Sequence, residues 1–180
     1  TDGEILGEEY GELLFTDYGL SGIVVMNLST LINDKRLQFG QDKAVAIIDF
    51  VPEMSEEQLV AHCEKFHSFD GILPLKLATI IEKQSGGDIQ RAARCIKNQR
   101  IIITGTKGYE FAQITKGGVP NSELTDENES TLVPFLYIVG ELTDNQFECG
   151  GFNLTYALYS GLNAANSITK RLTLNNYDKN

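Results

Sequence analysis

A glycine and an acidic residue follow a short apolar run near the C-terminus, and this placement suits ligand binding. The run extends from Phe135 to Val139, has the length of a buried strand, and stops at Gly140. Open α/β sheets bind ligands at the carboxyl ends of their strands, where Glu141 would lie. A carboxylate there can accept hydrogen bonds from ligand hydroxyl groups. Without further context, a solvated acid in a turn gives the same pattern.

A second candidate group opens a long apolar helix. Gly150 and Gly151 precede Phe152 and Asn153, where this helix begins. Glycines let backbone N–H groups approach a ligand closely, and a helix N-terminus carries partial positive charge. The group therefore suits a ligand that gains negative charge during a reaction. An ordinary helix cap after a glycine turn is the alternative.

Other residues offer weaker chemistry. The pair Gly117 and Gly118 either lines a ligand site or allows a tight crossover of the chain, and the sequence leaves both open. Cys149 has no CxxC partner. No strong general acid is evident, although Tyr156 and Asp144 are candidates. No standard zinc-binding spacing is matched by His62, Cys63 and His67, so we expect no metal site.

The elements that must position these residues follow from hydrophobic periodicity. Residues 13–16 and 23–29 are predicted to form two strands about a glycine-containing turn. A β-rich run extends over 44–51, and strands resume at 100–104 and 109–114. The β regions are interrupted by a small helical group over 55–98.

Capping residues mark the three helices of this group. Ser55 and Gln58 fit a capping box, flanked by the hydrophobic staple of Met54 and Leu59. Pro74 is expected to start the second helix, which Gly86 and Gly87 stop, and Asp88 to cap the third.

The C-terminal helix is predicted over about 153–169. Its apolar residues alternate at spacings of four and three, which is typical of a continuous buried stripe, and residues 171–180 read as a frayed tail. The stripe consists of Leu154, Leu158, Gly161, Ala165 and Ile168.

Composition limits the possible partners. The 180 residues carry a net charge of −10 and a pI near 4.6, and no basic run is present, so we expect no nucleic-acid partner. The basic residues Arg91, Arg94, Lys97 and Arg100 are interpreted as a solvated helix face. No stretch has the length of a membrane span, and three widely spaced cysteines favour a reducing compartment. A cytoplasmic location, without membrane contact, is therefore expected.

Four motifs in order resemble the C-terminal half of the BaiN/RdsA-type family of NAD(P)/FAD-dependent oxidoreductases. They are GELLFTDYGLSG (11–22), FAQITKGGV (111–119), the pair Glu129-Ser130, and LYIVGELTDNQFECGGFNLTYALYSG (136–161). In that family, an FAD-binding domain of the glutathione-reductase type is interrupted by an insert domain, a β-barrel that carries a helical group. The resemblance implies an α+β fold: a partial β-barrel with a helical group, then a strand–helix segment that completes the α/β FAD-binding domain.

The resemblance also assigns the candidate residues. It implies that Gly140 and Glu141 contact the ribityl chain of FAD, and that Gly150 to Asn153 approach the flavin ring edge. Gly117 and Gly118 lie where the chain returns from the insert to the flavin domain. The complete enzyme would use NAD(P)H as reductant and a small organic molecule as acceptor.

The expected domains are an insert over 1–115, a flavin-domain segment over 116–170 and a tail over 171–180. None of the 17 glycines belongs to a strand–GxGxxG–helix unit, so the N-terminal Rossmann half is expected to be missing and this chain to be an inactive fragment. The alternative is that residues 1–115 form a non-catalytic β-barrel module for substrate recognition or protein interaction.

Overall fold

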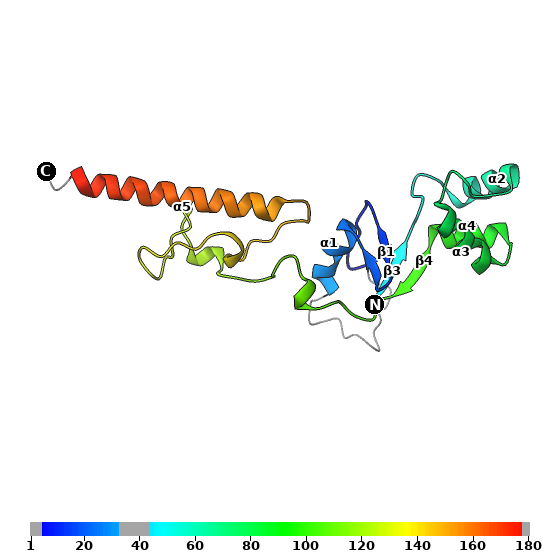
Figure 1. The fold of residues 1–180 in the computed structure, drawn as a ribbon, viewed down its shortest axis with the longest axis horizontal. Helices are drawn as coiled ribbons and strands as arrows, with labels where there is room; N and C mark the ends of the chain where they lie inside the picture. The colour runs from blue at the N-terminus through cyan, green and yellow to red at the C-terminus, as the bar shows by residue number, and fades with distance from the viewer. Residues whose placement is uncertain (1–4, 33–43, 178–180) are drawn as a thin grey trace. The chain divides into compact units, whose positions relative to one another are not determined.

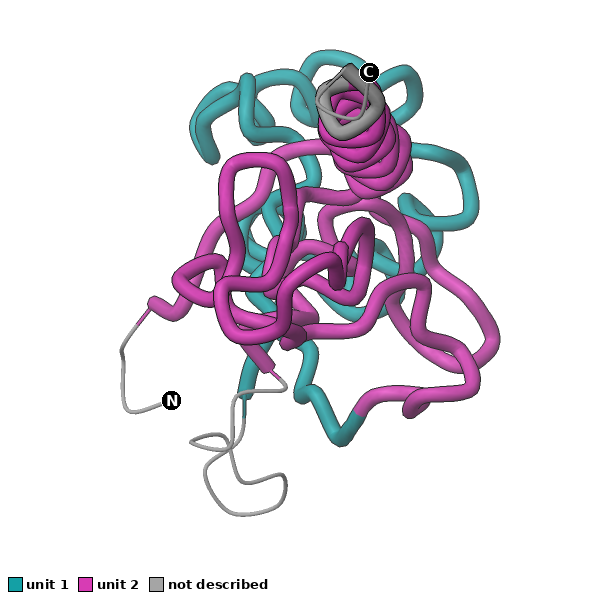
Figure 2. Tube along the Cα trace, turned by 90° about the vertical axis from the view of Figure 1, so that its left-hand side faces the viewer, with its two compact units in different colours: residues 1–4, 35–105 teal, residues 5–34, 106–180 magenta. Residues whose placement is uncertain are grey.

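The computed structural model of the protein describes residues 5–32 and 44–177 (Figure 1). The described residues divide into two compact units, coloured separately in Figure 2. One unit contains residues 44–105, and the other contains residues 5–32 and 106–177. The fold is mixed α+β, with two short sheets and no closed barrel among the described residues.

The first unit is a two-stranded ribbon that carries a helical group at one end. Its elements in order are β3 (Val45–Ile48), α2 (Glu56–Phe66), α3 (Leu75–Ser85), α4 (Ile89–Lys97) and β4 (Gln99–Ile102). Strand β3 pairs antiparallel with β4, so that Val45 lies opposite Ile102 and Ile48 opposite Gln99. The prediction of a helical group interrupting a β region is confirmed.

The predicted capping residues begin and end these helices. Ser55 and Gln58 form both hydrogen bonds of a capping box at the start of α2. Gly86 ends α3 in the left-handed conformation, at φ 66°, which glycine adopts without a steric penalty. Asp88 accepts a hydrogen bond of 3.0 Å from the Arg91 backbone N–H at the start of α4. Each of these contacts is local in sequence, which is why the sequence predicts it.

Small residues on α4 let this helix pack against both α2 and α3. Ala93 and Ile96 of α4 and Leu59 of α2 are fully buried. The core of the unit also includes Val51, Cys63, Phe69, Leu73, Ala78, Ile81 and Ala92. Desolvation by burial raises the pKa of the Cys63 thiol, and the negative charges of Glu82 and Glu64 raise it further. This cysteine is therefore a structural residue rather than a reactive thiolate.

The second unit begins with a hairpin of β1 (Leu14–Thr16) and β2 (Gly19–Ser21), followed by α1 (Ile23–Ile32). The prediction of a strand over 23–29 is wrong. The Gly22 carbonyl accepts the N–H groups of Val25 and Met26, at 3.1 and 3.0 Å, and so begins a helix. Gly22 has φ 103°, and a Cβ there would lie 2.6 Å from the Glu12 carbonyl oxygen.

Two further predicted strands do not form. Residues 109–114 contain the short 3-10 helix η1 (Tyr109–Phe111), whose turn uses the N–H groups of Phe111 and Ala112. Residues 135–139 form a single bridge, between Tyr137 and Glu129, and the Ile138 N–H donates to Asn128. Several backbone N–H groups of both segments are bonded within loops and are not available to a neighbouring strand, namely those of Phe111, Ala112, Leu136 and Ile138.

The long helix α5 (Phe152–Tyr177) closes the chain and lies beside the looped segment that precedes it (Figure 1). It includes residues 171–177, so the prediction of a frayed tail is wrong for them. The predicted buried stripe is also wrong, because Leu154 and Leu158 are 73% and 78% exposed. The face that packs on the unit instead carries Ser160 and Ala164. None of the described helices, α5 included, combines the length and apolar character needed to cross a membrane.

We predict that Leu59→Ala lowers the free energy of unfolding by about 2–5 kcal/mol, because it leaves a cavity in the core of the helical group. Leu75→Ala, at a position that is 74% exposed on α3, is the matched control and should change it by no more than about 0.5 kcal/mol. Urea denaturation followed by circular dichroism measures both. Equal effects of the two substitutions would contradict this assignment of the core.

Candidate functional site

The segment containing Gly140 and Glu141 is held directly on α5. It forms the 3-10 helix η3 (Gly140–Leu142), and the Gly140 N–H donates to the Ser160 hydroxyl at 3.0 Å. Gly140 has φ 62°, and a Cβ there would lie 3.4 Å from the Cβ of Ala157. Both Gly140 and Ser160 are buried, so a side chain at 140 would meet the helix in a backbone conformation that already favours glycine.

A hydrogen-bonded network extends from this contact to the surface. The Thr143 hydroxyl lies 2.8 Å from the Gly140 carbonyl and 3.1 Å from the Tyr156 hydroxyl. Asn145 donates to the same Tyr156 oxygen at 2.7 Å and exchanges two amide hydrogen bonds with Asn121. The Tyr156 oxygen therefore accepts hydrogen bonds from both Thr143 and Asn145, which gives Tyr156 a structural role in this network.

Gly118 allows the chain at residues 118–119 to lie against the segment 142–144. Val119 and Thr143 form a parallel bridge, with hydrogen bonds of 2.9 Å from Val119 to Leu142 and from Asp144 to Val119. A Cβ at Gly118 would lie 2.6 Å from the Thr143 carbonyl carbon. Of the two alternatives for the glycine pair, a tight crossover accounts for Gly118. A Cβ at Gly117 would meet nothing within 4 Å, although φ 97° favours glycine there.

Glu141 lies at the exposed edge of the same segment. One of its carboxylate oxygens, Oε1, accepts a hydrogen bond from the Thr115 backbone N–H, which fixes the side chain beside the returning chain. Among the described residues, Oε2 accepts no hydrogen bond and remains available to a hydroxyl donor. Glu141 therefore has a structural contact in this segment, and its role as an acceptor for a ligand stays a prediction.

Gly150 to Asn153 form the open N-terminal end of α5. Gly151 has φ 93°, and no atom lies within 4 Å of the position of a Cβ there. Asn153 accepts from the Phe147 N–H at 3.3 Å and donates to the Phe147 carbonyl at 3.1 Å, which closes the preceding loop. The first turn of the helix has N–H groups without intrahelical acceptors. This end can therefore stabilise negative charge on a ligand.

A buried carboxylate clamps the loop before Gly140 to the far half of α5. Glu129 accepts 2.8 Å hydrogen bonds from Arg171 Nη1 and the Phe135 N–H, and a longer one of 3.4 Å from the Tyr137 hydroxyl. Hydrogen bonds from Arg171 and from the Phe135 backbone hold the pKa of Glu129 below its ordinary range. The motif named Glu129, but its partner Arg171 lies in the segment predicted to be a tail.

The structure places one group of predicted residues against α5, another at the start of that helix and the third beside Thr143. The groups are Gly140-Glu141, Gly150 to Asn153 and Gly117-Gly118. Cys149 lies next to α1 instead, where its backbone N–H donates to Asn27 at 2.8 Å. The sequence gives no indication of Thr143, Asn145 or Ser160, because an isolated small polar residue has no pattern that predicts a distant partner.

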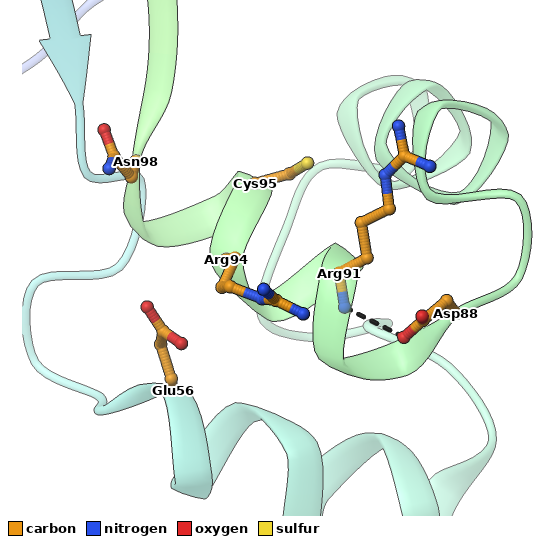
Figure 3. Close-up of a pocket in the computed structure, with 6 residues that line it drawn as sticks. All are labelled: Glu56, Asp88, Arg91, Arg94, Cys95 and Asn98. Carbon is orange, nitrogen blue, oxygen red and sulfur yellow. Dashed lines mark hydrogen bonds between the residues drawn. The ribbon is translucent and has the colours of Figure 1, made fainter.

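The first unit has a shallow, open depression between α2 and α4 (Figure 3). Its lining residues are Glu56, Asp88, Arg91, Arg94, Cys95 and Asn98. Two carboxylates balance the two guanidinium groups. Lys97, the next basic residue, is turned away into an ion pair of 2.6 Å with Asp49 and a hydrogen bond to the Val51 carbonyl. The basic residues of α4 thus form no continuous positive surface of the kind that binds nucleic acid.

Comparison with known proteins gives a family and three named relatives. Residues 4–114 match the family described as "HI0933-like protein barrel and H2TH domain". The 3-dehydro-bile acid delta(4,6)-reductase of Clostridium scindens is 32% identical over 93% of this chain and 46% of its own length. The ribosomal RNA dihydrouridine synthases of Escherichia coli and Haemophilus influenzae are each 26% identical, over 87% and 90% of this chain and 42% and 43% of their own lengths. The chain therefore spans less than half the length of these relatives.

We predict that Glu129→Gln removes a pH-dependent part of the stability. The folded pKa of Glu129 lies below its ordinary value of 4.5, so its contribution is complete above pH 4.5 and is lost as the pH falls through the folded pKa. The stability difference between the parent chain and the variant should therefore shrink as the solution is acidified. Urea denaturation across acidic pH measures it, with the exposed neighbour Glu127→Gln as control. A difference that does not change with pH would contradict the clamp.

We also predict that Gly118→Ala destabilises the second unit by about 1–3 kcal/mol, because the added methyl group overlaps the Thr143 backbone. Gly161→Ala is the control. It lies in α5 with nothing within 4 Å of its Cβ position and should be neutral or stabilising by up to about 1 kcal/mol. Hydrogen exchange at Val119 and Asp144 should accelerate in Gly118→Ala alone. Unchanged exchange there would refute the tight crossover.

Proposed function

The chain belongs to the HI0933-like family, and from that premise we propose that it is one part of an FAD-dependent oxidoreductase. The complete enzyme would transfer hydride from NAD(P)H through FAD to a small organic acceptor. This chain would supply the insert domain, residues 1–115, and the ribityl and isoalloxazine side of the flavin site within residues 116–170. The observation that carries this proposal is that Gly140-Glu141 is anchored on α5, whereas Gly150 to Asn153 form the start of the same helix.

The two groups are spaced for an extended ligand. At a rise of about 1.5 Å per residue, Gly151 and the Ser160 that holds Gly140 lie about 13 Å apart along α5. The groups also differ in chemistry, since Glu141 accepts hydrogen bonds whereas the start of α5 donates them. A ligand with hydroxyl groups at one position and an electron-rich ring at the other matches both.

FAD fits these residues as a cofactor. Glu141 Oε2 would accept from a ribityl hydroxyl, and the N–H groups at Phe152 and Asn153 would face the flavin ring edge. Flavin supplies the hydride chemistry when bound, and the protein supplies orientation and electrostatics. The partial positive charge at the start of α5 would stabilise negative charge on the ring, and the absence of a side chain at Gly151 leaves room for its approach.

The names of the relatives indicate the class of acceptor. A 3-dehydro-bile acid with delta(4,6) unsaturation and a uridine base each contain a carbon–carbon double bond conjugated to a carbonyl group. Dihydrouridine is the product of adding hydrogen across that bond. We infer that the acceptor of this enzyme is likewise a conjugated carbonyl compound. The absence of a nucleic-acid partner stays a prediction, as does a cytoplasmic location.

The exposed apolar face of α5 favours the presence of a second half of the enzyme that covers it. The apolar residues Leu154, Leu158, Ile168 and Leu172 are 39–78% exposed. They alternate at spacings of four and three with Gly161 and Ala165, on a different face of the helix from Ser160. A helix with apolar residues on an exposed face becomes stable in water when another surface covers it. We infer that the N-terminal Rossmann half covers this apolar face of α5, here called the seam, and so completes the glutathione-reductase-type FAD-binding domain.

We predict that this chain alone retains little FAD through gel filtration. A chimaera in which it replaces the matching region of the Clostridium scindens relative should retain FAD stoichiometrically. Leu158→Asp should reduce the flavin content of the chimaera at least about tenfold, because a charge would be buried in the seam. Leu75→Asp, on exposed α3, is the control. Visible absorption after gel filtration gives the flavin content.

Two outcomes would contradict the proposal. If this chain alone retained one FAD per molecule, it would contain a complete cofactor site, and the proposal that it supplies only one side of the site would be wrong. A folded chimaera that binds no flavin, although the relative itself does so, would refute the assignment of the residues on α5.

A further inference from the structure

A lysine and two aromatic rings converge on the surface of the second unit. The ammonium nitrogen of Lys107 lies over the Tyr18 ring, 3.8 Å from its centroid, and over the Phe111 ring, 3.9 Å from its centroid. Tyr18 comes from the turn of the β1–β2 hairpin and Phe111 from η1, so the two rings are brought together from distant parts of the sequence. Both residues are more than half exposed, at 56% and 60%.

The backbone fixes the rings, whereas the lysine is free to move. The Thr16 hydroxyl donates to the Gly19 carbonyl at 2.9 Å and closes the hairpin around Tyr18. The Phe111 N–H donates to the Gly108 carbonyl at 3.2 Å, and Gly108 has φ 84°, a conformation that favours glycine. Lys107 makes no ion pair among the described residues, and its long side chain has several rotatable bonds.

The spacing of this group suits a flat ring. A flat ring stacked on an aromatic face makes van der Waals contacts of about 3.5–4.0 Å. This is the range in which both rings now hold the ammonium group. Asp17 and Glu110 directly precede Tyr18 and Phe111 in the sequence, and their negative charges favour a neutral ligand over an anion. A ligand ring that stacks there would displace the Lys107 ammonium group to the edge of the ligand, where the ammonium group can donate to a carbonyl oxygen of the ligand.

We propose that Tyr18 and Phe111 form the binding site for a neutral, planar, conjugated carbonyl ring, and that Lys107 donates a hydrogen bond to its carbonyl oxygen. The ligand class rests on the proposed function, whereas the site rests on the geometry of these three residues. Stacking selects a flat unsaturated ring over its puckered reduced form. The site therefore discriminates a conjugated acceptor from its hydrogenated product.

The test is ligand binding to the 180-residue chain, measured by saturation-transfer NMR. Testosterone, a flat conjugated ketone, is compared with its reduced form dihydrotestosterone, and uridine with dihydrouridine. Each unsaturated compound that binds should bind at least about fivefold more tightly than its reduced form. Tyr18→Ala and Phe111→Ala should each weaken binding by about 5- to 100-fold, the effect of removing one stacking ring. Lys107→Ala should weaken binding of both steroids, because dihydrotestosterone keeps the carbonyl oxygen to which Lys107 would donate.

The control is a second cation–π pair of this chain, Lys65 over Phe66 in α2, with a separation of 5.1 Å. Phe66→Ala also removes an exposed ring and should leave binding unchanged. Binding of testosterone alone identifies a steroid-like ketone as the source of the ring, and binding of uridine alone identifies a nucleobase. The proposal is overturned if neither compound binds, if the reduced forms bind equally well, or if Tyr18→Ala and Phe111→Ala have no effect.

The chimaera separates this inference from the proposed function. Retained FAD without ketone binding would overturn the aromatic site and leave the flavin assignment intact. Ketone binding that depends on Tyr18, in a folded chimaera without FAD, would establish the aromatic site and overturn the flavin assignment.

Discussion

The contact between the Gly140 backbone and the Ser160 hydroxyl fixes the candidate site, because it joins the loop that carries Glu141 to helix α5. Ser160 is fully buried and also donates to the backbone of its own helix at Tyr156. A buried hydroxyl that lost its partner would have to be desolvated without compensation. Gly140 makes this bond with φ 62°, a left-handed conformation that favours glycine.

Agreement between sequence and structure follows the range of the interactions. The helical group was predictable because its capping box, its terminal glycine and the Asp88 cap are set by neighbours within four residues. Strands depend on a partner elsewhere in the chain. The apolar run 135–139 has strand composition, yet its N–H groups are bonded within a loop, and residues 23–29 became a helix because Gly22 turned the chain first.

The candidate site shows the same division. Motif residues such as Glu141 and Gly150 were predictable, whereas Ser160, Thr143 and Asn145 were found only through contacts between segments distant in sequence. For α5, the spacing of Leu154 and Leu158 identified residues that share a face, and this is correct. Periodicity does not show what covers a face, and here the described part of the chain covers a different face of α5.

The arrangement of α5 explains how cofactor binding and assembly would depend on each other. Its inner face is held by directional polar contacts, from Ser160 to Gly140 and from Arg171 to Glu129, which set the position of the loops. Its outer face offers apolar area, whose burial is favourable but not directional. Covering the outer face would therefore stabilise α5 without changing how its inner face holds Glu141. A partner half that docks there would place the rest of a cofactor site against groups that are already in position.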